Sequence, residues 1–131
     1  MATIHAGTMK EITYSGTAPT ATVVGAHLLD NAQAGDKILL NKVFAGALVT
    51  DVKLVCAAMS GVKLDIGFEY VDGLPGSRDD AFFSGVDAAG RKDSDAPPVR
   101  LEHDAIIVAT VKSGTASGQI TTVTTFEPRG V

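Results

Sequence analysis

The sequence contains few of the residues that form cross-links and aromatic surfaces. Its 131 residues include one cysteine, no tryptophan, two tyrosines and five phenylalanines. A single cysteine excludes an internal disulfide, and so few aromatic side chains argue against a base-stacking surface or a large aromatic ligand pocket. Because Cys56 falls on the inward side of an alternating segment, we predict that it is a small buried hydrophobic residue and not a nucleophile.

Long apolar runs and clusters of like charge are also missing. The formal net charge is −4, from 11 basic and 15 acidic residues scattered along the chain, so we expect neither nucleic acid nor a membrane as a partner. No apolar run approaches the ~20 residues that a spanning helix needs. The opening residues, MATIHAGTMKE, lack the pattern of a secretion signal, and we expect the chain to stay in the cytosol where it is made.

Residues that build catalytic or metal sites do not occur at the spacings that such sites need. His5, His27 and His103 lie far apart, without the paired spacing of a metal site. The aspartates within residues 72–95 do not follow the order of a calcium loop. Nucleophile and phosphate-loop motifs are missing as well. We therefore expect no metal, no cofactor and no enzymatic activity.

The sequence does contain short segments in which apolar and polar residues alternate. Two such runs meet at Met59-Ser60-Gly61, within residues 49–71. This Ser-Gly pair between alternating runs predicts the turn of a β-hairpin. The other strands would be added to the two strands of this hairpin. Seven residues are expected to face one core: Val52, Leu54, Val62, Leu64, Ile66, Phe68 and Ile106. Tyr70 and Ala58 are also expected to point inward with their strands.

Similar segments lie on both sides of the predicted hairpin. The pattern predicts strands at residues 20–29, 36–44, 99–102, 105–112 and 119–126. The last two would form a hairpin, and the threonine-rich final segment would be an outer strand. Residues 77–98 are expected to form a long loop, pinned to the core by Ala81-Phe82-Phe83. The chain is thus predicted to be all-β: a single-domain antiparallel β-sandwich, or a jelly-roll-like barrel, of about eight strands.

The first residues have weaker periodicity than the rest of the chain. We divide the chain into an N-terminal arm or first strand, residues 1–19, and a β-sandwich domain, residues 20–131. Four larger apolar residues mark the arm: Ile4, Met9, Ile12 and Tyr14. They are compatible with a first strand and, equally, with a segment that becomes ordered on a partner.

Four segments together resemble small β-rich virion proteins of tailed bacteriophages, which are often head decoration (capsid cement) proteins. The segments are DVKLV at residues 51–55, VKLDIGFEY at 62–70, DDAFFSGVDAAG at 79–90 and ASGQITTVTTF at 116–126. The resemblance covers about residues 36–126, and its most specific part is Asp80-Ala81-Phe82 followed by Gly85, Val86 and Asp87.

The resemblance implies a compact β-sandwich or jelly roll, commonly a homotrimer, seated where capsid subunits meet. It implies a non-enzymatic decoration protein that binds the outer head surface, with the major capsid protein and its own copies as partners. The location would be the virion, assembled in the host cytoplasm. We expect Ile4, Met9, Ile12 and Tyr14 to contribute to the attachment.

Two other functions are compatible with the sequence. One is a neck, tail or head-fibre component of the virion. The other is a carbohydrate-binding β-sandwich, which the absence of tryptophan and the expected inward position of Tyr70 disfavour.

Overall fold

The computed structural model describes residues 3–6, 21–94 and 96–127 of the chain. These residues form ten strands and one short 3-10 turn, η1 (Val71–Gly73). The strands are β1 (Thr3–His5), β2 (Ala21–Ala32), β3 (Lys37–Val43), β4 (Leu48–Cys56), β5 (Lys63–Tyr70), β6 (Arg78–Asp87), β7 (Gly90–Asp93), β8 (Val99–Arg100), β9 (Ala105–Ser113) and β10 (Ala116–Glu127). No helix in this part of the chain is long and apolar enough to cross a membrane.

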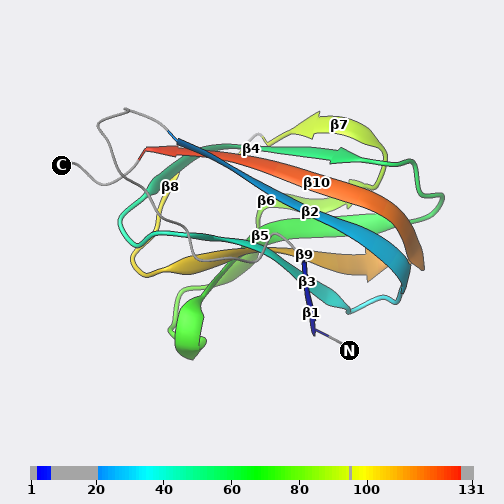
Figure 1. The fold of residues 1–131 in the computed structure, drawn as a ribbon, viewed down its shortest axis with the longest axis horizontal. Helices are drawn as coiled ribbons and strands as arrows, with labels where there is room; N and C mark the ends of the chain where they lie inside the picture. The colour runs from blue at the N-terminus through cyan, green and yellow to red at the C-terminus, as the bar shows by residue number, and fades with distance from the viewer. Residues whose placement is uncertain (1–2, 7–20, 95, 128–131) are drawn as a thin grey trace.

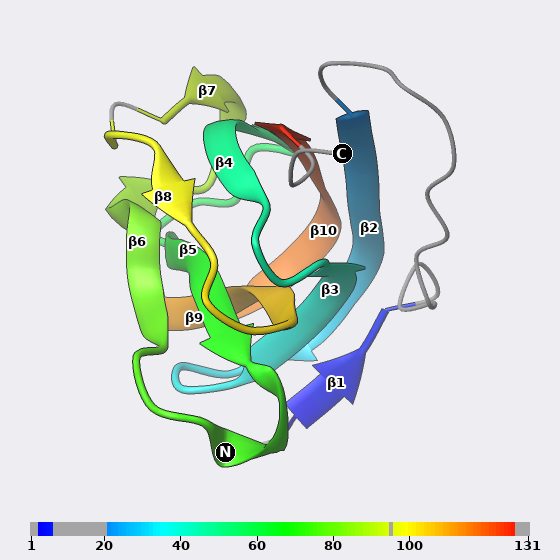
Figure 2. The same ribbon diagram turned by 90° about the vertical axis from the view of Figure 1, so that its left-hand side faces the viewer.

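The strands form two sheets that pack face to face (Figures 1 and 2). Sheet A has the order β1-β3-β9-β5-β6, and sheet B has the order β2-β10-β4-β7, with β8 also paired to β4. Among the described residues, β1 pairs with β3 in parallel, and all other strand pairs are antiparallel. The predicted all-β sandwich is confirmed, although three of its ten strands are short additions with four residues or fewer.

All strands except β1 pair as one long hairpin that has curled over on itself. β2 pairs with β10, β3 with β9, β4 with β7 and β8, and β5 with β6 at the tip. The curling brings β10 beside β4 and β9 beside β5. This is the strand arrangement of a jelly roll. It buries the inward faces of both sheets against each other and gives the sandwich one continuous core.

Two predicted hairpins are wrong, because consecutive strands lie in different sheets. β4 belongs to sheet B and β5 to sheet A, so Met59-Ser60-Gly61 turns a corner of the sandwich. β9 and β10 are separated in the same way. Gly61 does have the positive φ expected of a turn, 72°. The alternation of β4 ends at Cys56, and Ala58 is exposed at the corner, not inward.

The long loop expected at residues 77–98 is also wrong, because it contains β6 and β7. β6 is the outermost strand of sheet A, and its first three residues, Arg78, Asp79 and Asp80, are exposed. Charged residues are common on edge strands because they discourage pairing with other chains. In the sequence those same residues are typical of a loop. Phe82 and Phe83 are buried and hold the strand to the core.

The core contains most of the residues predicted for it. Leu54, Leu64 and Ile66 have no exposed surface, and Phe68 is 1% exposed. Cys56 is buried, as predicted, and burial raises the pKa of its thiol. Ile106 was predicted incorrectly: it is half-buried on the outer face of β9, and Ile107 faces the core in its place.

The threonine-rich strand β10 is not an outer strand, contrary to the prediction. It lies between β2 and β4 in sheet B, and Thr122 and Thr124 are fully buried on its inward face. Threonine is β-branched and fits a strand interior almost as valine does. Its hydroxyl groups therefore gave a false indication of solvent exposure.

Candidate interaction surface

The structure describes one of the four residues predicted to bind a partner. Ile4 lies in β1, pairs in register with Ile38 of β3 and packs against the core while remaining partly exposed. Met9, Ile12 and Tyr14 lie outside the described residues. Their role in attachment stays a prediction.

Titratable side chains do not assemble into a metal centre in the described part of the chain. No group of three or more histidine, cysteine, aspartate or glutamate side chains comes together there in an arrangement that would hold an ion. Charged residues instead form ion pairs between strands.

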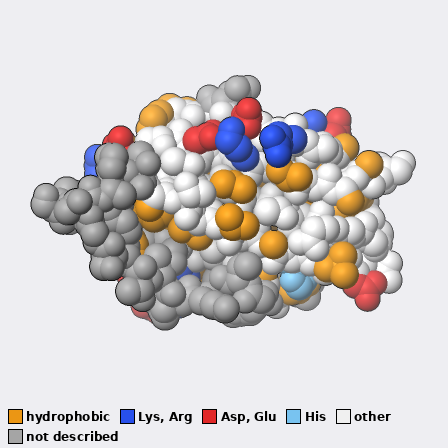
Figure 3. All heavy atoms as spheres, turned by 45° about the horizontal axis from the view of Figure 1, so that its top comes forward, with side chains coloured by type: hydrophobic (Ala, Val, Ile, Leu, Met, Phe, Trp, Pro, Cys, Tyr) orange, Lys and Arg blue, Asp and Glu red, His pale blue; other side chains and the backbone are white. Residues whose placement is uncertain are grey.

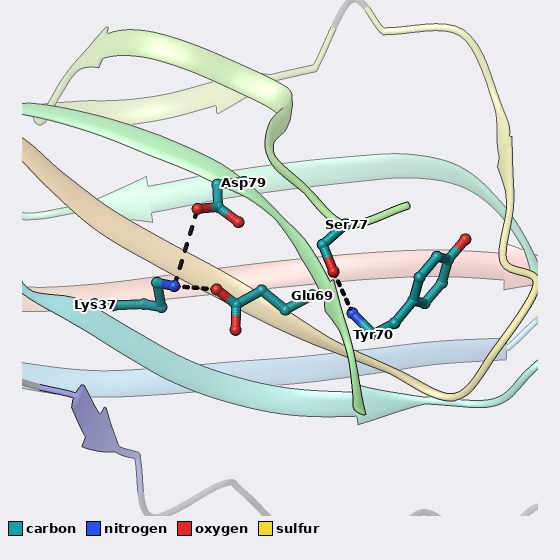
Figure 4. A network of polar contacts seen from close by, with 5 residues as sticks. All are labelled: Lys37, Glu69, Tyr70, Ser77 and Asp79. Carbon is teal, nitrogen blue, oxygen red and sulfur yellow. Dashed lines mark hydrogen bonds and ion pairs between the residues drawn. The ribbon is translucent and has the colours of Figure 1, made fainter. Parts of the chain in front are cut away.

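One network of such contacts lies on the outer face of sheet A (Figure 4). Lys37 of β3 donates a hydrogen bond to Glu69 of β5, and its ammonium nitrogen lies 3.9 Å from a carboxylate oxygen of Asp79 on β6. The hydrogen bond to Glu69 raises the pKa of Lys37. Burial raises the pKa of Asp79, because it outweighs the attraction of Lys37, and nearby carboxylates add to the effect. These contacts link β3, β5 and β6, and we interpret them as stabilising the sheet.

Tyr70, the tyrosine considered for sugar binding, is committed to contacts within the fold. Its backbone N–H donates to the Ser77 hydroxyl oxygen at 2.9 Å (Figure 4). Its phenolic oxygen accepts from the Glu102 backbone N–H at 3.2 Å, and its ring meets His103 edge-on at 5.0 Å. With 7% of its surface exposed, Tyr70 offers no platform for a sugar ring.

The outer face of sheet B is divided into two halves of different character. Between Thr22 and Leu28 of β2, and between Gln119 and Thr125 of β10, the outward side chains carry no charge, and we call this area the uncharged face. The exposed Asp30 and Glu127 lie beyond it, near the ends of the two strands. The uncharged face consists of Thr22, Val24, Ala26, Leu28, Gln119, Thr121, Val123 and Thr125. Val24 is 50% exposed and Leu28 is 64% exposed. Figure 3 shows hydrophobic side chains across the middle of this side of the molecule, with charged side chains gathered mainly at the top and others at the margins.

The other half, formed by β4 and β7, carries charges that satisfy one another. The Lys53 ammonium lies 3.5 Å from the Asp51 carboxylate and 3.2 Å from that of Asp93. The hydrogen bond to Asp93 raises the pKa of Lys53. The charges of this half therefore pair with one another, whereas the uncharged face combines neutral polar side chains with the exposed apolar side chains of Val24 and Leu28.

The sheet edges are protected to different degrees. On β6, Arg78, Asp79 and Asp80 accompany two register shifts against β5. Both features discourage the addition of another strand. β2 is the end strand of sheet B, yet residues 21–29 include no charged residue and no proline. Sequence reasoning missed this surface, although the charge-free stretch at 20–29 was a signal for it.

Comparison with known proteins identifies the fold but no sequence family. No family model matches the chain, and no curated protein sequence matches it. Among solved structures, a chain in the capsid of Ralstonia phage GP4 is similar, with a TM-score of 0.75 and 17% identity over 98% of this chain and 99% of that chain.

Two further phage capsids contain similar chains. One is the acid-stable capsid of Helicobacter pylori bacteriophage KHP30, with a TM-score of 0.66 and 14% identity over 86% of this chain and 90% of that chain. The other is the capsid asymmetric unit of cyanophage Pam1, with a TM-score of 0.65 and 13% identity over 90% of this chain and 93% of that chain. In all three comparisons the shared fold covers most of both chains.

Proposed function

We propose that this protein is a structural protein of a bacteriophage capsid, of the decoration or cement type, that binds the outer head surface and stabilises it. The observation that supports this most directly is the similarity of its jelly roll to chains from three phage capsids, over 86% to 98% of this chain. The decoration role comes from the sequence resemblance described above. The protein acts by binding and not by catalysis, and it is located in the virion after assembly in the host cytoplasm.

The major capsid protein is the proposed partner, and the uncharged face of sheet B is the proposed contact surface. Val24 and Leu28 expose apolar side chains that a partner would remove from water, which is favourable at about 25 cal/mol per Å². The N-terminal residues Ile4, Met9, Ile12 and Tyr14 extend this contact. Copies of the chain form a homotrimer, in which one interface repeats and closes without a free end.

Binding to phage heads tests the proposed function. Purified protein is mixed with undecorated heads of the source phage and sedimented, and the protein is expected in the pellet at a saturable ratio. Failure of the wild-type protein to bind heads would overturn the decoration role and leave a neck, tail or fibre position.

Single substitutions then test the contact surface. Val24→Asp and Leu28→Asp place a charge on the uncharged face and are expected to weaken binding at least about tenfold, since each buries a charge in the contact. Leu74→Asp is the matched control, because Leu74 is also an exposed large hydrophobic residue, 37% exposed, but lies in the turn after β5. Equal binding by all three variants would rule out the uncharged face.

A further inference from the structure

Polar side chains are buried between the two sheets without hydrogen-bond partners among the described residues. Asn41 is 1% exposed, and Thr122 and Thr124 are fully buried. Both amide atoms of Asn41 and both threonine hydroxyl groups lack a partner in this part of the chain. Burying such groups unsatisfied is costly, and most buried polar groups in proteins have a partner. This cluster therefore needs an explanation that hydrophobic packing does not give.

Asn41 reaches the core because β3 contains a bulge. The register of β3 against β9 shifts between Leu39 and Asn41, so that Leu40 is an extra residue in the strand. Leu40 and Asn41 are both buried, with exposures of 0% and 1%. A bulge re-aims side chains, and this one directs an amide into the space between the sheets.

Gly25 on β2 packs closely against that amide, because it has no side chain. A Cβ at Gly25 would lie 2.6 Å from Asn41 Oδ1 and 3.1 Å from Thr122 Oγ1. Since both oxygens are near the same point, they lie within about 6 Å of each other, yet they form no direct hydrogen bond. Two polar atoms within this limit can both reach one intervening molecule. Thr122 is also the register partner of Gly25, so the three residues come together from β2, β3 and β10.

We infer that Asn41 and Thr122 form an internal binding site for a water molecule that bridges the two sheets. Water can donate to Asn41 Oδ1 and exchange a second hydrogen bond with the Thr122 hydroxyl, which supplies partners to both residues. Asn41, Thr122 and Thr124 are the only buried polar side chains among the described residues, and none of them is charged. The site therefore suits a neutral molecule and not an ion.

Nuclear magnetic resonance of the isotopically labelled wild-type protein tests this site directly. Magnetisation transfer from water to the Asn41 side-chain amide and the Gly25 backbone N–H is expected, because the bound molecule stays close to both. A crystal structure that resolves ordered water should show a peak within hydrogen-bonding distance of Asn41 and Thr122. A dry interior, with the Asn41 amide bonded directly to protein, would overturn the inference.

A double-mutant cycle tests whether the two residues share one ligand. Thr122→Val and Asn41→Leu each should lower the folding equilibrium constant about tenfold. The double variant should be no less stable than the less stable of the two single variants. Thr124→Val is the matched control, since Thr124 is equally buried on the same face of β10. Its effect should simply add to that of Asn41→Leu. Additive effects in both cycles would contradict the shared water.

One further pair of variants covers the case in which Asn41→Leu does not fold. Thr122→Ser keeps the hydroxyl group and should keep the magnetisation transfer from water to the Asn41 amide. Thr122→Val removes the hydroxyl and should weaken that transfer. The same signal in both variants would show that Thr122 is not a ligand of the water molecule.

Discussion

Phe68 is the most informative single residue of the core. Its ring centroid lies 5.2 Å from that of Tyr70 and 6.2 Å from that of Phe82, and the side chain is 1% exposed. Phe68→Ala is expected to lower the free energy of unfolding by about 2–5 kcal/mol, through lost burial and the cavity left behind. Urea denaturation would measure the loss. Val24→Ala, at an exposed position, is the control and should change stability little. A loss of similar size in both variants would contradict this account of the core.

Asp79 and Asp87 are expected to respond to pH with opposite signs. Burial raises the pKa of Asp79 above 3.8, because it disfavours the ionised carboxylate in the folded protein. The protonated carboxyl therefore favours folding, and this contribution is lost as pH rises through the raised pKa. The hydrogen bond from Lys63 lowers the pKa of Asp87, so its contribution is present above pH 3.8 and is lost as pH falls.

Two asparagine substitutions measure this difference. At neutral pH, Asp79→Asn should raise the urea midpoint and Asp87→Asn should lower it. At about pH 3, below the ordinary aspartate pKa, both variants should approach the wild-type midpoint. A fall in the midpoint of Asp79→Asn at neutral pH would show that its attraction to Lys37 outweighs its burial.

At the scale of the strands, Gly67 determines how closely β6 can approach β5. A Cβ on Gly67 would lie 2.1 Å from the Arg78 carbonyl oxygen and 2.3 Å from the Asp79 carbonyl carbon. Because these are backbone atoms, β6 would have to move, and Gly67→Ala should destabilise the protein by at least about 3 kcal/mol. Thermal unfolding would measure this.

Gly61→Ala provides the comparison for Gly67→Ala. Gly61 has a φ of +72°, and nothing lies within 4 Å of the position of its Cβ. Alanine there should cost only about 1 kcal/mol of backbone strain. If the Gly61 variant were the less stable of the two, close strand approach would not be the reason for Gly67.

The sequence predicts which face of each strand is buried better than it predicts which strands pair with one another. Val62, Leu64 and Ile66 were correctly placed inward, because alternation within one segment reports which side is buried. Pairing depends on residues far away: β10 pairs with β2 and β4, and not with β9, the strand before it. The same limit applies to the candidate site, because the uncharged face combines β2 and β10, which are distant in the sequence.

For the whole molecule, the proposed attachment by the N-terminal stretch is tested by deleting residues 2–14. The sandwich should still fold, because β1 is only three residues long and pairs at the edge of sheet A. Binding to undecorated heads should be lost or strongly reduced, and wild-type binding should depend weakly on salt, since screening affects charges and not apolar contacts. Circular dichroism and co-sedimentation would measure the two effects.

The alternative results of this deletion have distinct meanings. Undiminished binding by the shortened protein would remove the N-terminal stretch from the contact. Unfolding of the shortened protein would instead show that the stretch is part of the core. Analytical ultracentrifugation of the full chain gives the companion measurement, in which a species of three chains is expected and a monomer at high micromolar concentration would contradict the homotrimer.

The pairing of β2 with β10 also determines how the domain responds to mechanical load. Ala21, the first residue of β2, is the register partner of Phe126, near the end of β10. Tension between these two residues would unzip the pair one hydrogen bond at a time, whereas tension along the strands would load the bonds together. In single-molecule pulling, Ala21 and Phe126 should therefore be a weak pair of attachment points. Leu28 and Phe126, which lie toward opposite ends of the same strand pair, should sustain a higher force.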